Sequence, residues 1–107
     1  MSKELIYEVD DVKITYIKRS PPEYRIDATG KTRTAGWSKA ELSAVVYVQP
    51  PPDGIYDYQF VAEPPSEVSS QVLTPISSQK VLEKMPTGFR GVRVHAESNK
   101  KEALLEE

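Results

Sequence analysis

Apolar and polar residues alternate along two segments that flank a proline-rich turn, residues 42–49 and residues 55–63. A period of two is typical of a β-strand with one buried face, and β-branched and aromatic residues favour that structure. Neither segment contains Gly or Pro, whereas the Pro-Pro-Pro-Asp-Gly sequence between them is typical of a turn. The second segment carries an aromatic stripe that we expect at the centre of the core: Tyr56, Tyr58, Phe60 and Ala62.

The same alternation predicts further short strands on either side of this pair. Three lie in the N-terminal part, at residues 5–9, 12–16 and 24–28, and one covers residues 89–98. Pro75 removes a main-chain donor, so we expect the segment around it to form an edge strand or a bend. The predicted inward positions are Leu5, Tyr7 and Val9; Val12, Ile14 and Tyr16; Tyr24, Ile26 and Ala28; Val92, Val94 and Ala96.

Two segments are less regular. Ser38 and Glu41 have the spacing of a helical capping box, which predicts one helical turn before the strand that begins at Leu42. Residues 99–107 favour a helix intrinsically but end in charge, so we expect a frayed terminus there. The predicted domain therefore spans residues 1–98, and a charged C-terminal tail follows it.

The spacing of strands and turns predicts the fold class. About seven short strands, with turn signals roughly every 8–12 residues, indicate an all-β fold, an antiparallel β-sandwich of the immunoglobulin-like kind. A small barrel is the alternative. The chain of 107 residues is the length of one domain. It has no Cys, so the disulfide of antibody domains is missing, and Trp37 is the candidate for a similar central packing role.

Composition excludes several classes of function. Without Cys there are no thiolate zinc sites and no Cys nucleophile, and the absence of disulfides favours a reducing compartment. The N-terminal residues carry acids early and lack an apolar signal region, and no apolar run approaches the roughly 20 residues that span a bilayer. We therefore expect a cytoplasmic protein. The net charge of −2 argues against a dedicated nucleic-acid binder, which needs a basic face.

Charge is unevenly distributed along the chain. Residues 40–79 contain five acidic residues and no Lys or Arg, whereas residues 80–101 contain six basic residues against two acidic ones. Either the domain has two electrically different faces, or these charges pair across neighbouring strands, which is common in sheets. We expect the pairing.

No motif specifies a reaction. Gly30-Lys31-Thr32 resembles the end of a phosphate-binding loop, but the earlier glycine and the strand–loop–helix context are missing. His95 is the only histidine, so one chain cannot form a multi-histidine metal site, and alternation places it on the polar face of its strand. Asp53-Gly54 is explained by turn chemistry, because Asp bonds its own main chain and Gly accepts positive φ. We predict no catalytic residue, no metal site and no cofactor.

The candidate binding residues lie around the central turn. Tyr47 and Val45 fall on the face of their strand opposite Leu42, so we expect an outward apolar patch unless another segment covers it. Pro51 and Pro52, followed by Asp53, make a loop with fixed φ angles, which loses little entropy when it binds.

These features favour a non-enzymatic module that binds another protein through proline-rich loops or an exposed strand face. A carbohydrate-binding domain is the alternative, and Trp37 with Tyr47 is the ring pair it would use. A small hydrolase is a third possibility, and it would need His95 beside a carboxylate and a hydroxyl group. The sequence predicts no oligomeric state.

Overall fold

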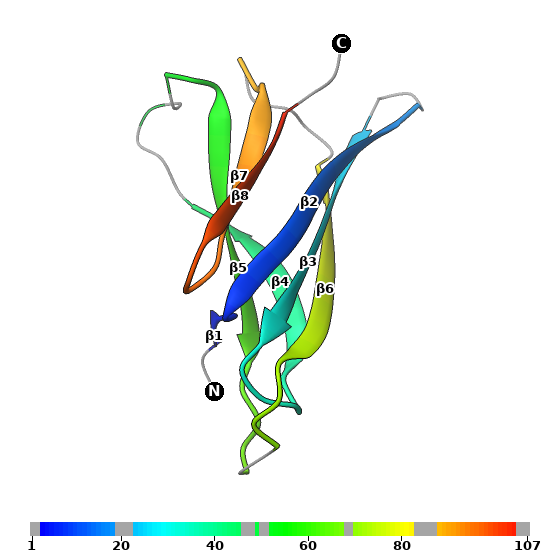
Figure 1. Cartoon of the computed structure of the whole chain (residues 1–107). Helices are drawn as coiled ribbons and strands as arrows, with labels where there is room; N and C mark the ends of the chain where they lie inside the picture. Colours follow the sequence, from blue (N-terminus) through cyan, green and yellow to red (C-terminus); the bar gives the residue numbers. More distant parts are fainter. Residues whose placement is uncertain are drawn as a thin grey trace.

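The structure is a computed structural model, and its description covers the following residues: 3–18, 23–45, 49, 52–67, 70–82 and 88–104. Within these residues the chain forms eight strands and no helix, and the strands make two sheets (Figure 1). The all-β prediction and the prediction of two packed sheets are confirmed. In the part of the chain described, no helix of sufficient length and apolar character to cross a membrane occurs.

Sheet B contains three antiparallel strands, β2 (Glu8–Ile17), β3 (Glu23–Thr32) and β6 (Thr74–Leu82), in the order β2-β3-β6. The register shifts between Val9 and Asp11, which is a bulge within one continuous strand. Pro75 lies in the edge strand β6, as its missing main-chain donor predicts.

Sheet A is built around β5 (Ile55–Glu63), and its other members are β1 (Glu4–Leu5), β4 (Ser38–Ala44), β7 (Gly91–His95) and β8 (Lys100–Leu104). The prediction of a wholly antiparallel sandwich is wrong at one pair, because β5 and β7 are parallel. Between them the chain crosses to sheet B as β6 and returns, and a parallel pair requires such a crossover connection.

The core lies between the two sheets. Phe60 is completely buried, and Tyr58 and Ala62 are buried beside it, so the predicted aromatic stripe is confirmed at these positions, while Tyr56 is half-buried. Val92 and Val94 are also completely buried. Other predicted inward residues that the structure buries are Val9, Val12, Ile26, Ala28 and Ala96.

The first predicted strand is two strands in different sheets. The chain leaves sheet A after Leu5 and enters sheet B at Glu8, so the period of two breaks between them. Ile6 is consequently the completely buried residue of this segment, whereas Leu5 and Tyr7 are only half-buried.

Two further predictions about local structure differ from the fold. The residues of the proposed capping box, Ser38 and Glu41, lie in β4, where Lys39 has a φ of 53° at a shift of register. Tertiary pairing with β5 thus replaces the helical turn. The tail expected to fray forms β8 as far as Leu104, because its main chain pairs with β7.

Asn99 joins the two sheets. It precedes β8, and its side chain bonds the main chain of β2 twice, accepting from Val9 N at 2.8 Å and donating to Val9 O at 2.9 Å. From this junction β2 and β8 diverge toward the upper end of the molecule in Figure 1. The sandwich is therefore closed at this junction and more open at the upper end.

Candidate functional site

The outer face of sheet A carries rows of polar side chains that run across the strands. Asp57, Arg93 and Glu102 are in register on β5, β7 and β8. Gln59 and His95 form the next row on β5 and β7. Residues in register point to the same side of a sheet, and Tyr58, Val92 and Val94 occupy the opposite, buried side.

Arg93 is the centre of an ionic network on this face. Its Nε donates to Glu102 Oε1 at 2.7 Å, and its Nη1 donates to Asp57 Oδ1 at 3.2 Å. A third carboxylate, that of Asp53, lies 3.7 Å from Nη2. The hydrogen bond to Glu102 is the main cause that raises the pKa of Arg93 above its ordinary value, although partial burial acts in the opposite direction. Carboxylates from β8, from β5 and from the turn before β5 therefore surround the guanidinium.

His95 is joined to the same network. Its Nε2 lies 2.8 Å from Asp57 Oδ1, and both side chains are more than half buried. His95 therefore lies on the polar face of its strand, as alternation predicts, and has a carboxylate partner there. Because Asp57 contacts both Arg93 and His95, it fixes the position of each relative to the other.

A shallow hollow of about 480 Å³ lies beside this network. Its apolar lining comes from Leu5, Val45 and Ala96. Its polar lining comes from Gln59 and from three members of the network, Asp57, Arg93 and His95. Val45 is exposed, and its main-chain N donates to Asp57 O at 3.0 Å, so it continues the edge of sheet A just beyond β4. The hollow thus combines apolar groups with fixed charges, and we name these residues the sheet A face.

Three of the predicted binding residues lie at or near the sheet A face. Val45 lines the hollow, as described above. Asp53 is exposed and reaches Arg93, while its Oδ1 accepts a hydrogen bond from Ile55 N at 3.0 Å. That bond and the φ of 74° at Gly54 confirm the predicted turn chemistry. Pro52 is exposed immediately before Asp53. The other two residues predicted at this turn, Tyr47 and Pro51, lie outside the described residues.

Trp37 is not part of this face. It immediately precedes β4 and Val45 immediately follows it, so eight residue steps, about 26 Å of extended chain, separate them. Its ring packs against the buried cluster, and its Nε1 donates to Thr34 Oγ1 at 3.0 Å. Trp37 therefore supports the core at the opposite end of the strand.

The network has part of the arrangement that nucleophilic catalysis requires. A histidine paired with a carboxylate can act as a general base for a hydroxyl group within about 3 Å. Ser43 is in register with Gln59, which is in register with His95, so two strand spacings, roughly 10 Å, separate Ser43 from His95. The oxygen of Asp57 that contacts His95 also accepts a hydrogen bond from Arg93. Among the described residues, no group of three or more His, Asp and Glu side chains could hold a metal ion.

Sequence reasoning missed the central role of Arg93 and the participation of Glu102 and Leu5. Alternation correctly predicts that Arg93 and His95 lie on the polar face of β7 and that Asp57 lies on the polar face of β5. The missing information was the parallel pairing of β5 with β7, which sets the two faces side by side. The expected pairing of the acidic and basic segments does occur here, through Asp53 and Asp57 with Arg93.

No family model matches this chain, and the chain has no match among curated proteins or among solved structures.

Proposed function

We propose that this protein is a small cytoplasmic binding module with an immunoglobulin-like sandwich fold, and that it binds another protein through the sheet A face without catalysing a reaction. The observation that carries the proposal is the fixed arrangement of Arg93 and His95 around Asp57, next to the exposed Val45. Arginine beside apolar groups is typical of the residues that dominate protein interfaces.

The network supports binding because its side chains are already ordered. Immobilising a long side chain at an interface costs free energy, and Arg93 is held by Glu102 and Asp57 before any partner arrives. The hollow is open and shallow, which suits a protruding side chain of a protein partner better than an enclosed small molecule.

The test is a comparison of partner binding by wild type and Val45→Asp. Partners are captured quantitatively from native lysate, identified by mass spectrometry, and then titrated against the purified proteins by calorimetry. We expect Val45→Asp to weaken a partner that uses the sheet A face by about tenfold or more, because it places a charge in the apolar part of the interface.

Val81→Asp is the matched control, since Val81 is 46% exposed on β6 of sheet B. It should leave the affinity unchanged, and thermal unfolding of both variants verifies that they are folded. Equal affinities of wild type, Val45→Asp and Val81→Asp for every captured partner would show that the sheet A face is not the binding surface.

A hydrolase is the second candidate, and the contact between His95 and Asp57 is the observation that favours it. It predicts that a fluorophosphonate probe labels the protein and that His95→Ala abolishes the labelling. Labelling that depends on His95 would replace the binding proposal with a catalytic one.

A further inference from the structure

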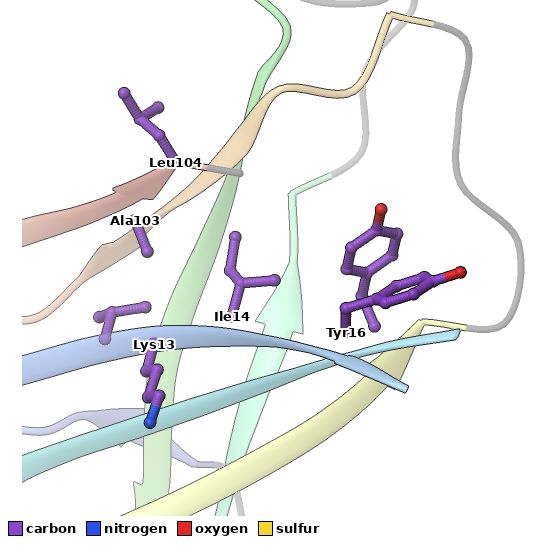
Figure 2. A pocket seen from close by; sticks show the side chains of 7 residues that line it. Lys13, Ile14, Tyr16, Ala103 and Leu104 are labelled. Atoms are coloured by element: carbon purple, nitrogen blue, oxygen red, sulfur yellow. The ribbon is translucent and has the colours of Figure 1, made fainter. Parts of the chain in front are cut away.

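A second hollow opens between the two sheets where β2 and β8 diverge. Its volume is about 480 Å³, and Figure 2 shows Ile14 and Tyr16 on one side of β2, with Ala103 across the gap. Val12, Tyr24 and Leu104 complete the apolar lining. Lys13 also lines the hollow, although its side chain leaves β2 on the side opposite Ile14 and Tyr16. One side of β2 is therefore apolar toward the hollow, and the other side carries charge.

The aromatic wall of this hollow is held from behind. The ring centroids of Tyr16 and Tyr24 are 5.3 Å apart, and those of Tyr24 and Phe89 are 6.5 Å apart. Phe89 in turn stacks on Tyr56, with a centroid distance of 5.8 Å. Tyr16, at the open end of this row, is 54% exposed. The fold thus supports a large apolar ring whose outer face has no cover from the described residues.

The outer edge of β2 has hydrogen-bonding capacity in the same place. Sheet B ends at β2, and an edge strand presents main-chain N–H and C=O groups to its free side. At Val9 these groups are bonded by Asn99. In the described part of the chain no other hydrogen bond reaches this edge, so the outward N–H and C=O groups between Asp11 and Ile17 have no hydrogen-bond partner there.

The charges along this edge are also open to a partner. Asp11 and Lys13 are both exposed, two positions apart on the same face of β2, and neither forms an ion pair within the described residues. Lys13 is in register with Asp27 of β3, but the Asp27 carboxylate is bonded by Arg25 at 3.0 Å. An added strand would place its own side chains beside Asp11 and Lys13.

We propose that this edge binds an extended segment of a partner protein as an additional antiparallel strand. The segment pairs with the main chain of β2 from Asp11 to Ile17. It places a carboxylate beside Lys13 and a cation beside Asp11, and it turns the alternate, apolar side chains into the hollow beside Tyr16. Main-chain pairing supplies affinity in this mode of recognition, and pockets for alternate side chains supply specificity. Antiparallel pairing is the more stable orientation.

This inference goes beyond the proposed function, because the edge belongs to sheet B and shares no residue with the sheet A face. The probe is the acetylated and amidated peptide Phe-Thr-Val-Glu-Val-Lys, in which Glu meets Lys13 and Lys meets Asp11. It is titrated into the isotope-labelled full chain, and binding is followed through the amide signals of the protein. We expect shifts at residues 11–17 and at Ala103.

The matched control is the isomer Phe-Thr-Val-Lys-Val-Glu, which has the same composition with the two charges exchanged. We expect it to bind about tenfold more weakly, because both cross-strand charge contacts become repulsive. The double variant Asp11→Lys, Lys13→Asp should reverse this preference. N-methylation of those alternate peptide nitrogens that face β2 should abolish binding to the wild-type protein. The Val45→Asp substitution in the protein should leave peptide binding unchanged.

Several results would overturn the proposal. Equal binding of the two isomers, or binding unaffected by N-methylation, would indicate non-specific apolar contact. The absence of shifts at residues 11–17 at millimolar peptide would exclude the added strand. Shifts at the same residues with maltohexaose but with neither peptide would assign the hollow to a glycan. A dimer whose contact maps to β2 in the protein alone would assign the edge to a second copy. If the double variant fails to fold, the comparison of isomers on wild type decides.

Discussion

Gly30 illustrates how a single residue is selected by its neighbours. It lies in β3 in register with Val9, where β2 carries its bulge. A Cβ at this position would collide with the main-chain oxygen of Glu8 and would lie 2.6 Å from Ile6 Cδ1. The bulge itself is on the neighbouring strand β2, not at Gly30. Glycine is required here because the adjacent main chain approaches closely.

We therefore expect Gly30→Ala to lower the free energy of unfolding by about 2–3 kcal/mol, because the collision is with main chain that cannot rotate away. Urea denaturation followed by circular dichroism measures the change. Thr29→Ala is the control at the adjacent exposed position, with an expected change within about 0.5 kcal/mol. A Gly30→Ala variant as stable as wild type would show that β2 moves freely at its bulge.

Lys31 gives a prediction that depends on pH. Its Nζ donates to Asp10 Oδ2 at 2.9 Å, and this hydrogen bond is the main cause that raises the pKa of Lys31 above its ordinary value. Glu8, at 3.6 Å, adds a smaller effect in the same direction. A raised pKa in the folded state stabilises the fold below the unfolded pKa, and this contribution is lost as the pH rises through the folded value.

The measurement is an NMR titration of the Lys31 side chain in alkaline solution. Asp10→Asn should lower its pKa toward the ordinary value, whereas Asp11→Asn, which removes a carboxylate that does not bond Lys31, should leave it unchanged. An equal effect of the two substitutions would indicate a general field of acidic residues rather than the specific contact.

At the scale of elements, β8 shows how pairing overrides intrinsic preference. The segment Lys100–Leu104 has helix-forming residues, but its main chain bonds β7 and its preceding residue bonds β2. A weak helical preference is easily outweighed by tertiary context. The Asn99 junction could not be anticipated, because nothing in a local pattern indicates that an asparagine will bond a strand 90 residues away in the chain.

Asn99→Ala should lower the free energy of unfolding by about 2–3 kcal/mol, since it leaves the N–H and C=O of the buried Val9 without these partners. Hydrogen exchange should be accelerated most at the Val9 amide. Ser98→Ala is the control in the same turn; its hydroxyl donates to Tyr7 O at an exposed position, and about 0.5–1 kcal/mol is expected. Equal losses from the two variants would contradict a special role of Asn99.

At the scale of the whole molecule, alternation predicted which side of most strands is buried but not which strands are neighbours. Tyr58, Phe60, Val92 and Val94 were assigned correctly because burial on one face leaves a period of two in the sequence. The sheet A face depends instead on Asp57 meeting Arg93, which follows from a parallel pairing between distant segments. The sequence therefore predicts the outward direction of Arg93 and His95, and the fold alone brings them to Asp57.

The crossover through β6 has a consequence for how the protein comes together. A chain cut between β5 and β6 yields one part with β1 to β5 and another with β6 to β8, and among these strands neither part holds a complete sheet. Loop closure over such separations costs entropy before the contacts form, so folding should be slow compared with helical proteins of this size. We therefore expect the two sheets to form together, in one cooperative folding transition.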